Sequence, residues 1–128
     1  MYGARLCVML DGVPLRLLIV DDSAEVLAVA RELLERQGLT VVGVALDGAT
    51  ALRSALEQRP DVALVDIDLG GESGFDLIDR FDPAVRVVLT STHASGDFAD
   101  LIESSGALGF LPKSELSASA IQALVATG

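Results

Sequence analysis

Short apolar runs alternate with amphipathic patterns along most of the chain. The runs cover residues 15–20, 39–45, 62–65, 85–90 and 107–111, and they consist mostly of leucine and β-branched residues. Runs this short, bounded by turn and cap residues, are typical of strands inside a parallel sheet, where both faces are buried. The pattern therefore predicts five strands, each followed by a segment of a different periodicity.

The intervening segments have the spacing of helices. After the first run, one helical face carries only apolar residues, namely Val26, Leu27, Ala30, Leu33 and Leu34. Asp22 followed by Glu25 predicts the N-terminal cap of this helix, and Gly38 predicts its left-handed end. Four more helices are predicted, over residues 48–59 with Asp47 as N-cap, from 73 to before 82, over 96–105 and over 117–125.

Five strand–helix units joined by right-handed crossovers predict an α/β fold. We expect a flavodoxin-like, doubly wound five-stranded parallel sheet in the order 2-1-3-4-5, with five helices on its two faces. Residues 15–128 would form this single domain, and residues 1–14 are interpreted as a leader or flexible N-terminal segment.

Composition narrows the class of protein. The mean hydropathy is +0.51, but every apolar stretch is interrupted well before the ~18 residues that a membrane span requires, so no membrane association is predicted. A net charge of −10 would repel nucleic acid; it fits a cation site or a basic partner, but by itself it favours simple solubility as the explanation. Cys7 is the only cysteine, which excludes an intrachain disulfide and agrees with a cytoplasmic location.

Polar residues collect where the predicted strands end. Asp21 and Asp22 follow the first strand, Asp66 the third, Thr90 and Ser91 close the fourth, and Lys113 follows the fifth. Because parallel strands end at one edge of a sheet, these side chains should converge. Clustered carboxylates repel one another unless a divalent cation lies between them, and oxygen ligands favour Mg²⁺. A hydroxyl and an ammonium beside them suit a phosphoryl group, with Asp66 as the nucleophile.

From residue 15 onward the sequence resembles the receiver domain of bacterial two-component response regulators. The resemblance rests on Leu-Ile-Val-Asp21-Asp22-Ser, Val-Ala-Leu-Val-Asp66-Ile-Asp, Val-Val-Leu-Thr90-Ser91 and Gly109-Phe110-Leu-Pro-Lys113. It implies a phosphoacceptor with slow self-dephosphorylation, not an enzyme, in which Asp66 takes a phosphoryl group from a sensor histidine kinase or phosphotransfer protein.

The resemblance also implies individual roles. Mg²⁺ would be held by Asp21, Asp22, Asp66 and the backbone carbonyl of Asp68, and Lys113 would pair with the phosphoryl group. The spacing from Lys113 favours Ser91 as the switch hydroxyl, with Thr90 second. Phe110 matches an aromatic residue that turns inward on activation, and it fits an ordinary core position equally well. Asp68 and His93 lie two positions beyond the phosphoacceptor and the switch hydroxyl, so we hypothesise that they tune the lifetime of the phosphoryl group; for His93 an exposed polar role is the favoured interpretation.

Three departures from the family pattern affect these expectations. Where a Met-Pro turn is common, the chain has residues 68–74, Asp-Leu-Gly-Gly-Glu-Ser-Gly, which predicts a looser loop. Ser114 stands where many members have a cis proline, so the geometry after Lys113 is open. The short interval from Asp66 to Ser91 predicts either a trimmed third helix or a missing turn around residues 79–83.

Other interpretations remain at this point. Asp66-Ile-Asp68 also resembles the nucleophile motif of haloacid-dehalogenase-type phosphatases, and the chain could be an interaction module that never takes phosphate, or a receiver cut from a longer DNA-binding regulator. A stand-alone receiver is the favoured interpretation. Its predicted output face, also a candidate homodimer interface, comprises the fourth helix, fifth strand and fifth helix. Candidates for coupling there, for which a core role is nevertheless the favoured interpretation, are Leu101, Ile102, Leu108 and Phe110.

Overall fold

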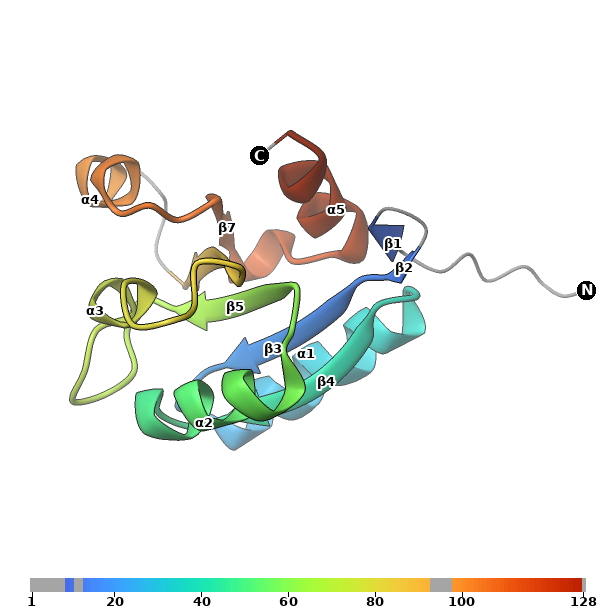
Figure 1. Cartoon of the computed structure of the whole chain (residues 1–128), viewed down its shortest axis with the longest axis horizontal. Coiled ribbons are helices and arrows are strands. Elements are labelled where there is room, and N and C mark those ends of the chain that lie inside the picture. The colour runs from blue at the N-terminus through green and yellow to red at the C-terminus, as the bar shows by residue number, and fades with distance from the viewer. Residues whose placement is uncertain (1–8, 11–12, 93–97, 128) are drawn as a thin grey trace, which may run out of the picture.

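A computed structural model describes residues 9–10, 13–92 and 98–127 of the chain (Figure 1). The central strands are β3 (Arg16–Val20), β4 (Thr40–Ala45), β5 (Val62–Asp66), β6 (Arg86–Ser91) and β7 (Gly109–Pro112). The helices are α1 (Ala24–Arg36), α2 (Gly48–Gln58), α3 (Gly74–Ile78), α4 (Ala99–Ser104) and α5 (Ala118–Thr127), with a 3-10 helix at Lys113–Glu115. Two short strands, β1 (Met9–Leu10) and β2 (Val13–Pro14), pair antiparallel before β3.

The five central strands form one parallel sheet in the order β4-β3-β5-β6-β7. This is the predicted order, with the second strand beside the first and the others following outward. The arrowheads of β3 and β5 point the same way in Figure 1, so the carboxyl ends of the strands share one edge. The functional residues predicted at the strand ends are therefore brought to the same side of the molecule.

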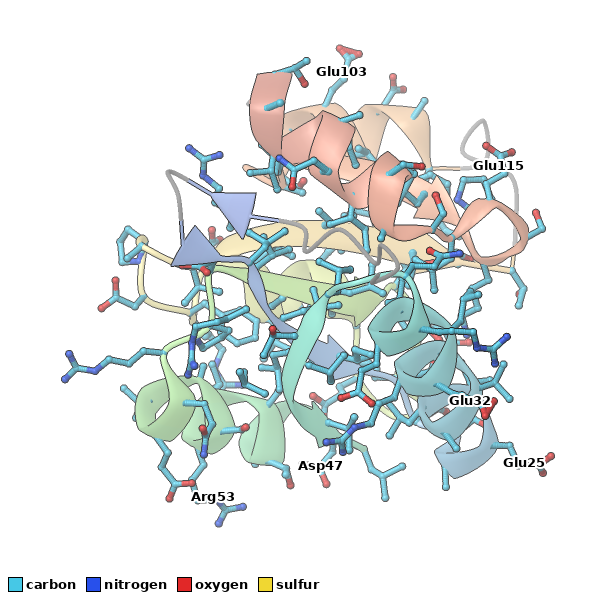
Figure 2. The ribbon with its side chains drawn as sticks, turned by 90° about the vertical axis from the view of Figure 1, so that its right-hand side faces the viewer. Glu25, Glu32, Asp47, Arg53, Glu103 and Glu115 are labelled. Carbon is cyan, nitrogen blue, oxygen red and sulfur yellow. The ribbon has the colours of Figure 1, made fainter. Side chains whose placement is uncertain are left out.

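Two apolar clusters cover the two faces of the sheet. On one face, Leu17, Ile19 and Leu64 pack under α1 and α5; on the other, Leu18 and Val65 pack under α2 and α3. Alternation of strand side chains explains the division, because successive residues point to opposite faces. The labelled acidic residues of α1, Glu25 and Glu32, project outward in Figure 2, as the amphipathic pattern predicts.

Most predicted helix ends are confirmed, and one is wrong. Asp47 caps α2 by accepting from Thr50 N at 2.8 Å, and Gly38 adopts φ 101° after α1. The N-cap of α1 is Ser23, whose Oγ accepts from Val26 N at 3.3 Å, and not Asp22. The carboxyl group of Asp22 is thereby left in the acidic cluster described below.

The third helix is short, as the interval from Asp66 to Ser91 predicts. It ends at Ile78, and residues 79–85 reach β6 without further helix. The predicted start of the fourth helix at Gly96 and the candidate His93 lie outside the described residues. No helix of the described part is long and apolar enough to cross a bilayer.

The coupling candidates divide between core and surface. Leu108 packs against the cluster under α1 and α5, and Ile102 and Phe110 pack against the cluster under α2 and α3. Leu101 is 54% exposed, so a core role is wrong for this residue. On a helix as short as α4, Leu101 and Ile102 face different sides, and only one of them can pack on the sheet.

The glycine-rich loop after β5 is more ordered than its composition predicts. Asp68 and Ser73 form an antiparallel bridge, made by Leu69 N donating to Glu72 O at 3.0 Å and Gly74 N donating to Ile67 O at 2.7 Å. Gly70 turns the chain with φ 77°, and Leu69 is buried in the core. Backbone pairing and a buried side chain thus replace the stiffness of the missing proline, which corrects the expectation of a loose loop.

Candidate functional site

The predicted polar residues converge at the carboxyl edge of the sheet. Asp66 is the last residue of β5 and pairs in register with Thr90, which pairs with Leu111 of β7. Asp21 follows β3 directly, and Lys113 follows β7. Residues from four neighbouring strands therefore meet in one row, as expected when parallel strands end together.

Three carboxyl groups make the acidic cluster of the site, which consists of Asp21, Asp22 and Asp66. Each offers an oxygen within 4.8 Å of the others. Asp21 is 2% exposed and Asp66 is 5% exposed, whereas Asp22 is open to solvent. One oxygen of each buried carboxyl group accepts from a backbone N–H, that of Ser23 for Asp21 (2.9 Å) and that of Asp68 for Asp66 (3.1 Å). The other oxygens are directed into the site.

Lys113 joins the two buried carboxyl groups. Its Nζ lies 2.7 Å from Oδ2 of Asp21 and 2.9 Å from Oδ2 of Asp66. The pairing with Asp21 was not expected from the sequence, which predicted contact with a phosphoryl group only. Lys113 is also the one lysine of the whole sequence, so its ammonium can be followed chemically without interference from another.

Burial and pairing act in opposite directions on these groups. Burial raises the pKa of Asp66, and the hydrogen bonds from Lys113 and from Asp68 N–H offset only part of this rise. Burial alone would lower the pKa of Lys113, but its ion pairs with Asp21 and Asp66 outweigh burial and raise that pKa. The ammonium of Lys113 is thus stabilised in its charged form. For Asp66, by contrast, the hydrogen bonds do not fully offset the cost of burying the charged carboxylate.

The net negative charge of the site favours binding of a divalent cation. Three carboxylates and one ammonium carry an excess of two negative charges within a few ångströms. All donors are oxygens, and Asp22 offers its oxygen from the solvent side. The bridge hydrogen bonds of the next loop use the carbonyls of Ile67 and Glu72 and leave the carbonyl of Asp68 out. This donor set suits a hard cation such as Mg²⁺.

Two buried hydroxyls stand beside the acidic cluster. Thr90 is 4% exposed and Ser91 is 2% exposed. By alternation, Ser91 shares the sheet face of Leu89 and of Phe110, the register partner of Leu89. Thr90 points to the opposite face, and its Oγ1 has no hydrogen-bond partner among the described residues. The face shared by Ser91 and Phe110 is the one over which α3 and α4 pack.

The start of α3 presses against the backbone of the central aspartate. A methyl group added at Gly74 would overlap the backbone carbonyl oxygen of Asp66 and lie 3.0 Å from its carbonyl carbon. Because this neighbour is backbone at the end of a central strand, it cannot yield without moving the site. Gly71, three positions earlier, has nothing within 4 Å of such a methyl group.

Gly74→Ala is therefore expected to lower the free energy of unfolding by about 2 kcal/mol through overpacking against Asp66. Urea unfolding followed by far-UV circular dichroism measures the change. Gly71→Ala is the matched control and should stay near the wild-type midpoint. Equal midpoints for both variants would contradict the close approach of α3 to Asp66.

Three contributors to the site were missed by sequence reasoning. Ser23 takes the cap position, Leu69 anchors the loop in the core, and Glu72 reaches across to α2, where its Oε1 accepts from Gly48 N at 2.9 Å. A local sequence pattern could have identified Ser23, because serine is a strongly preferred N-cap residue. Glu72 had no local signal, since its partner lies 24 positions away.

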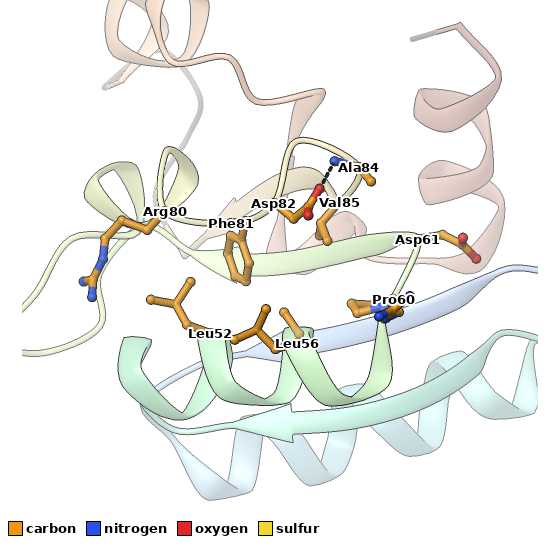
Figure 3. A pocket seen from close by; sticks show the side chains of 11 residues that line it. Leu52, Leu56, Pro60, Asp61, Arg80, Phe81, Asp82, Ala84 and Val85 are labelled. Atoms are coloured by element: carbon orange, nitrogen blue, oxygen red, sulfur yellow. Dashed lines mark hydrogen bonds between the residues drawn. The ribbon is translucent and has the colours of Figure 1, made fainter.

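A cavity of about 450 Å³ lies elsewhere, between α2 and the segment that follows α3 (Figure 3). Leu52, Leu56 and Phe81 contribute apolar walls, and Arg59 and Arg80 also line it. No member of the acidic cluster borders this cavity. The segment that lines it on the side opposite α2, residues 80–85, begins just after α3 ends at Ile78.

Known proteins resemble this chain over most of its length. A family model described as response regulator receiver domain matches residues 17–126. Response regulator GacA from Pseudomonas viridiflava is 32% identical over 114 residues, covering 86% of this chain and 53% of GacA. A protein-glutamate methylesterase/protein-glutamine glutaminase from Symbiobacterium thermophilum is 35% identical over 105 residues, covering 78% of this chain and 29% of that protein. The chain spans about half the length of GacA and less of the methylesterase.

Solved structures agree with the fold. A two-component response regulator of the LuxR family from Aurantimonas is 30% identical with a TM-score of 0.75, covering 88% of this chain and 85% of that chain. A response regulator from Burkholderia pseudomallei was solved with a phosphorylated aspartic acid, a calcium ion and citrate. It is 27% identical with a TM-score of 0.72, and the match covers 86% of this chain and 65% of that chain. The alternative of a haloacid-dehalogenase-type phosphatase receives no support from these similarities.

The sheet order, the convergence of acids, hydroxyls and lysine at its carboxyl edge, and the family match across residues 17–126 lead to the same assignment. This chain belongs to the response regulator receiver domain family.

Proposed function

We propose that this receiver domain accepts a phosphoryl group on Asp66 in a Mg²⁺-dependent reaction. The observation that carries the proposal is the position of Asp66, which is buried at the end of the central strand beside two more carboxyl groups and within 2.9 Å of the only lysine. A buried carboxylate with a charged neighbour and an exposed ligand site is chemically suited to nucleophilic attack on phosphorus.

Few groups of the site take part in the phosphoryl transfer. One carboxylate oxygen of Asp66 forms the P–O bond as the P–N bond of a phosphohistidine breaks, and the bonding electron pair leaves with the imidazole. Lys113 neutralises a phosphoryl oxygen, and Ser91 donates a hydrogen bond to another. Asp21, Asp22, Asp66 and the carbonyl of Asp68 would hold Mg²⁺, which supplies charge stabilisation of the phosphoryl oxygens when bound.

Ser91 is favoured over Thr90 as the switch hydroxyl. Ser91 shares a sheet face with Phe110, whereas Thr90 faces the other cluster. A hydroxyl drawn toward the phosphoryl group would make space on the face where Phe110 packs, and that movement would reach α4. Asp68, whose side chain is exposed, and His93 would affect the lifetime of the phosphoryl group.

The proposal extends to partners and location. Receiver domains exchange phosphoryl groups with histidine kinases or phosphotransfer proteins, and we place the domain, formed by residues 15–128, in the cytoplasm with them. The face of α4, β7 and α5 would contact a downstream protein or a second copy of the chain. Receiver domains generally have no enzymatic activity of their own, so we expect only slow self-dephosphorylation here.

Wild-type protein incubated with acetyl phosphate and Mg²⁺ is expected to gain the mass of one phosphoryl group. The measurement is intact mass spectrometry, with EDTA as the control that removes the cation. Hydroxylamine should reverse the gain, because it cleaves acyl phosphates. A gain that is unaffected by EDTA would contradict the metal site. Steady turnover of a simple phosphate ester would instead favour the phosphatase alternative.

A further inference from the structure

The loop after β5 is tied to a helix that has no part in the proposed phosphoryl chemistry. Glu72 ends the turn of this loop, and its carboxylate accepts a hydrogen bond from Gly48 N, the first residue of α2, at 2.9 Å. Asp47 already caps the same helix through Thr50 N. Glu72 thus satisfies a second backbone donor that the helix leaves free.

The contact has little tolerance on the helix side. A methyl group at Gly48 would overlap Oε1 of Glu72 and lie 3.2 Å from Cδ1 of Leu77. Gly48 is buried, although the side chain that approaches it comes from an exposed residue. A side chain at position 48 would therefore displace the carboxylate of Glu72 from its place against the start of α2.

The other end of the loop reaches the acidic cluster. Asp68 N donates to Oδ1 of Asp66, and Gly70 N donates to Oδ1 of Asp68 at 3.1 Å. A methyl group at Gly70 would lie 3.4 Å from Oδ2 of Asp22, so the tip of the loop lies against a proposed metal ligand. The loop between Asp68 and Ser73 is therefore fixed on two sides, at the site and at α2.

We propose that Glu72 is a positioning residue for the metal site, because it holds on α2 the loop whose Asp68 carbonyl would be a ligand. The inference rests on the proposed function, since it assumes that the acidic cluster binds a divalent ion. A ligand held in place before binding loses less freedom when the cation arrives, so the clamp raises affinity without touching the metal. The same contact would transmit any movement of the loop to α2.

Mn²⁺ binding measured by electron paramagnetic resonance tests the clamp, because the free ion gives a signal that the bound ion loses. Glu72→Ala is expected to weaken Mn²⁺ binding about tenfold. Glu72→Gln keeps the oxygen acceptor and removes the charge, so it should stay within about twofold of wild type if position matters. Equal loss in both variants would show a simple charge effect and overturn the proposal.

Gly48→Ala disrupts the same contact from the helix side and provides an independent variant. In the wild-type background it should weaken Mn²⁺ binding about as much as Glu72→Ala does. In the Glu72→Ala background it should add no further loss, because the two residues act through one interaction. Additive losses would overturn the proposal.

Hydrogen exchange supplies a readout of the contact itself. Adding Mg²⁺ should slow exchange of the amide of Gly48 in the wild type and leave it unchanged in Glu72→Ala. Wild-type protein that binds no Mn²⁺ would remove both this inference and the metal-dependent function. Tight binding by wild type and Glu72→Ala alike would remove only the inference.

Discussion

Asp66→Asn is expected to abolish phosphoryl transfer from acetyl phosphate under conditions in which the wild type is modified. The amide of asparagine lacks the anionic oxygen that attacks phosphorus, and nothing else at the site replaces it. Asp21 is held by Lys113 and by Ser23 N, and Asp22 lies at the solvent side of the cluster. The loss should therefore be complete within the sensitivity of intact mass spectrometry.

Loss of fold is not expected to explain this result. Burial raises the pKa of Asp66, so the folded state binds its proton more tightly than the unfolded state does. The stability that Asp66 contributes is then fully present below the unfolded pKa of about 4 and is lost as pH rises through the higher folded value. Asparagine removes this loss, and Asp66→Asn should be at least as stable as wild type at neutral pH.

Asp82→Asn is the matched control for the transfer experiment. Its carboxyl group is exposed and accepts from Ala84 N at 2.8 Å, and Asp82 is not a member of the acidic cluster. This variant should gain the phosphoryl mass at the wild-type rate. Phosphorylation of Asp66→Asn to the wild-type level would mean that another residue is the acceptor, and peptide mapping after borohydride reduction would identify it.

The strands and their convergence were predictable because a few strong constraints decide them. Short runs rich in valine and leucine, bounded by turn residues, are typical of interior strands, and the carboxyl ends of parallel strands share one edge of the sheet. Asp66 and Lys113 are far apart in sequence, yet the fold rule alone placed them together, and their atoms lie 2.9 Å apart. The family resemblance added the roles but was not needed for the convergence.

The cap of α1 shows where local patterns fail. Asp21, Asp22 and Ser23 are three consecutive candidates, and each could cap a helix. Asp21 is drawn instead to Lys113 at 2.7 Å, and its second oxygen accepts from Ser23 N. Ser23 caps the helix, and the ion pair that engages Asp21 has no local signal in the sequence, because Lys113 lies in a distant segment.

The loop after β5 shows the same limit in another form. Its glycines predicted flexibility, but the order comes from Leu69 in the core and from Glu72 on α2. Neither contact has a spacing that a sequence pattern reveals, because each depends on how the loop packs against elements formed elsewhere. Long-range packing thus determines the conformation of the loop, whereas its glycine content indicates only that many backbone conformations are sterically allowed.

Lys113→Met is expected to lower the free energy of unfolding by about 3 kcal/mol in the presence of EDTA at neutral pH. The substitution keeps the length of the side chain and removes the ammonium that pairs with Asp21 and Asp66. Two buried carboxyl groups then face each other without a positive charge between them. Urea unfolding with and without EDTA measures the effect.

Two dependences distinguish lost charge compensation from lost packing. Without Lys113, the pKa of Asp66 should rise further above its unfolded value, so the deficit of Lys113→Met should grow as pH rises through the folded pKa and shrink as pH falls toward about 4. Saturating Mg²⁺ should restore more stability to Lys113→Met than it adds to wild type, because a cation replaces the missing charge. Lys113→Arg keeps the charge and should lose much less stability than the methionine variant. If the stability deficit of Lys113→Met depends on neither pH nor Mg²⁺, Lys113 stabilises the fold through its methylene chain and not through its ion pairs.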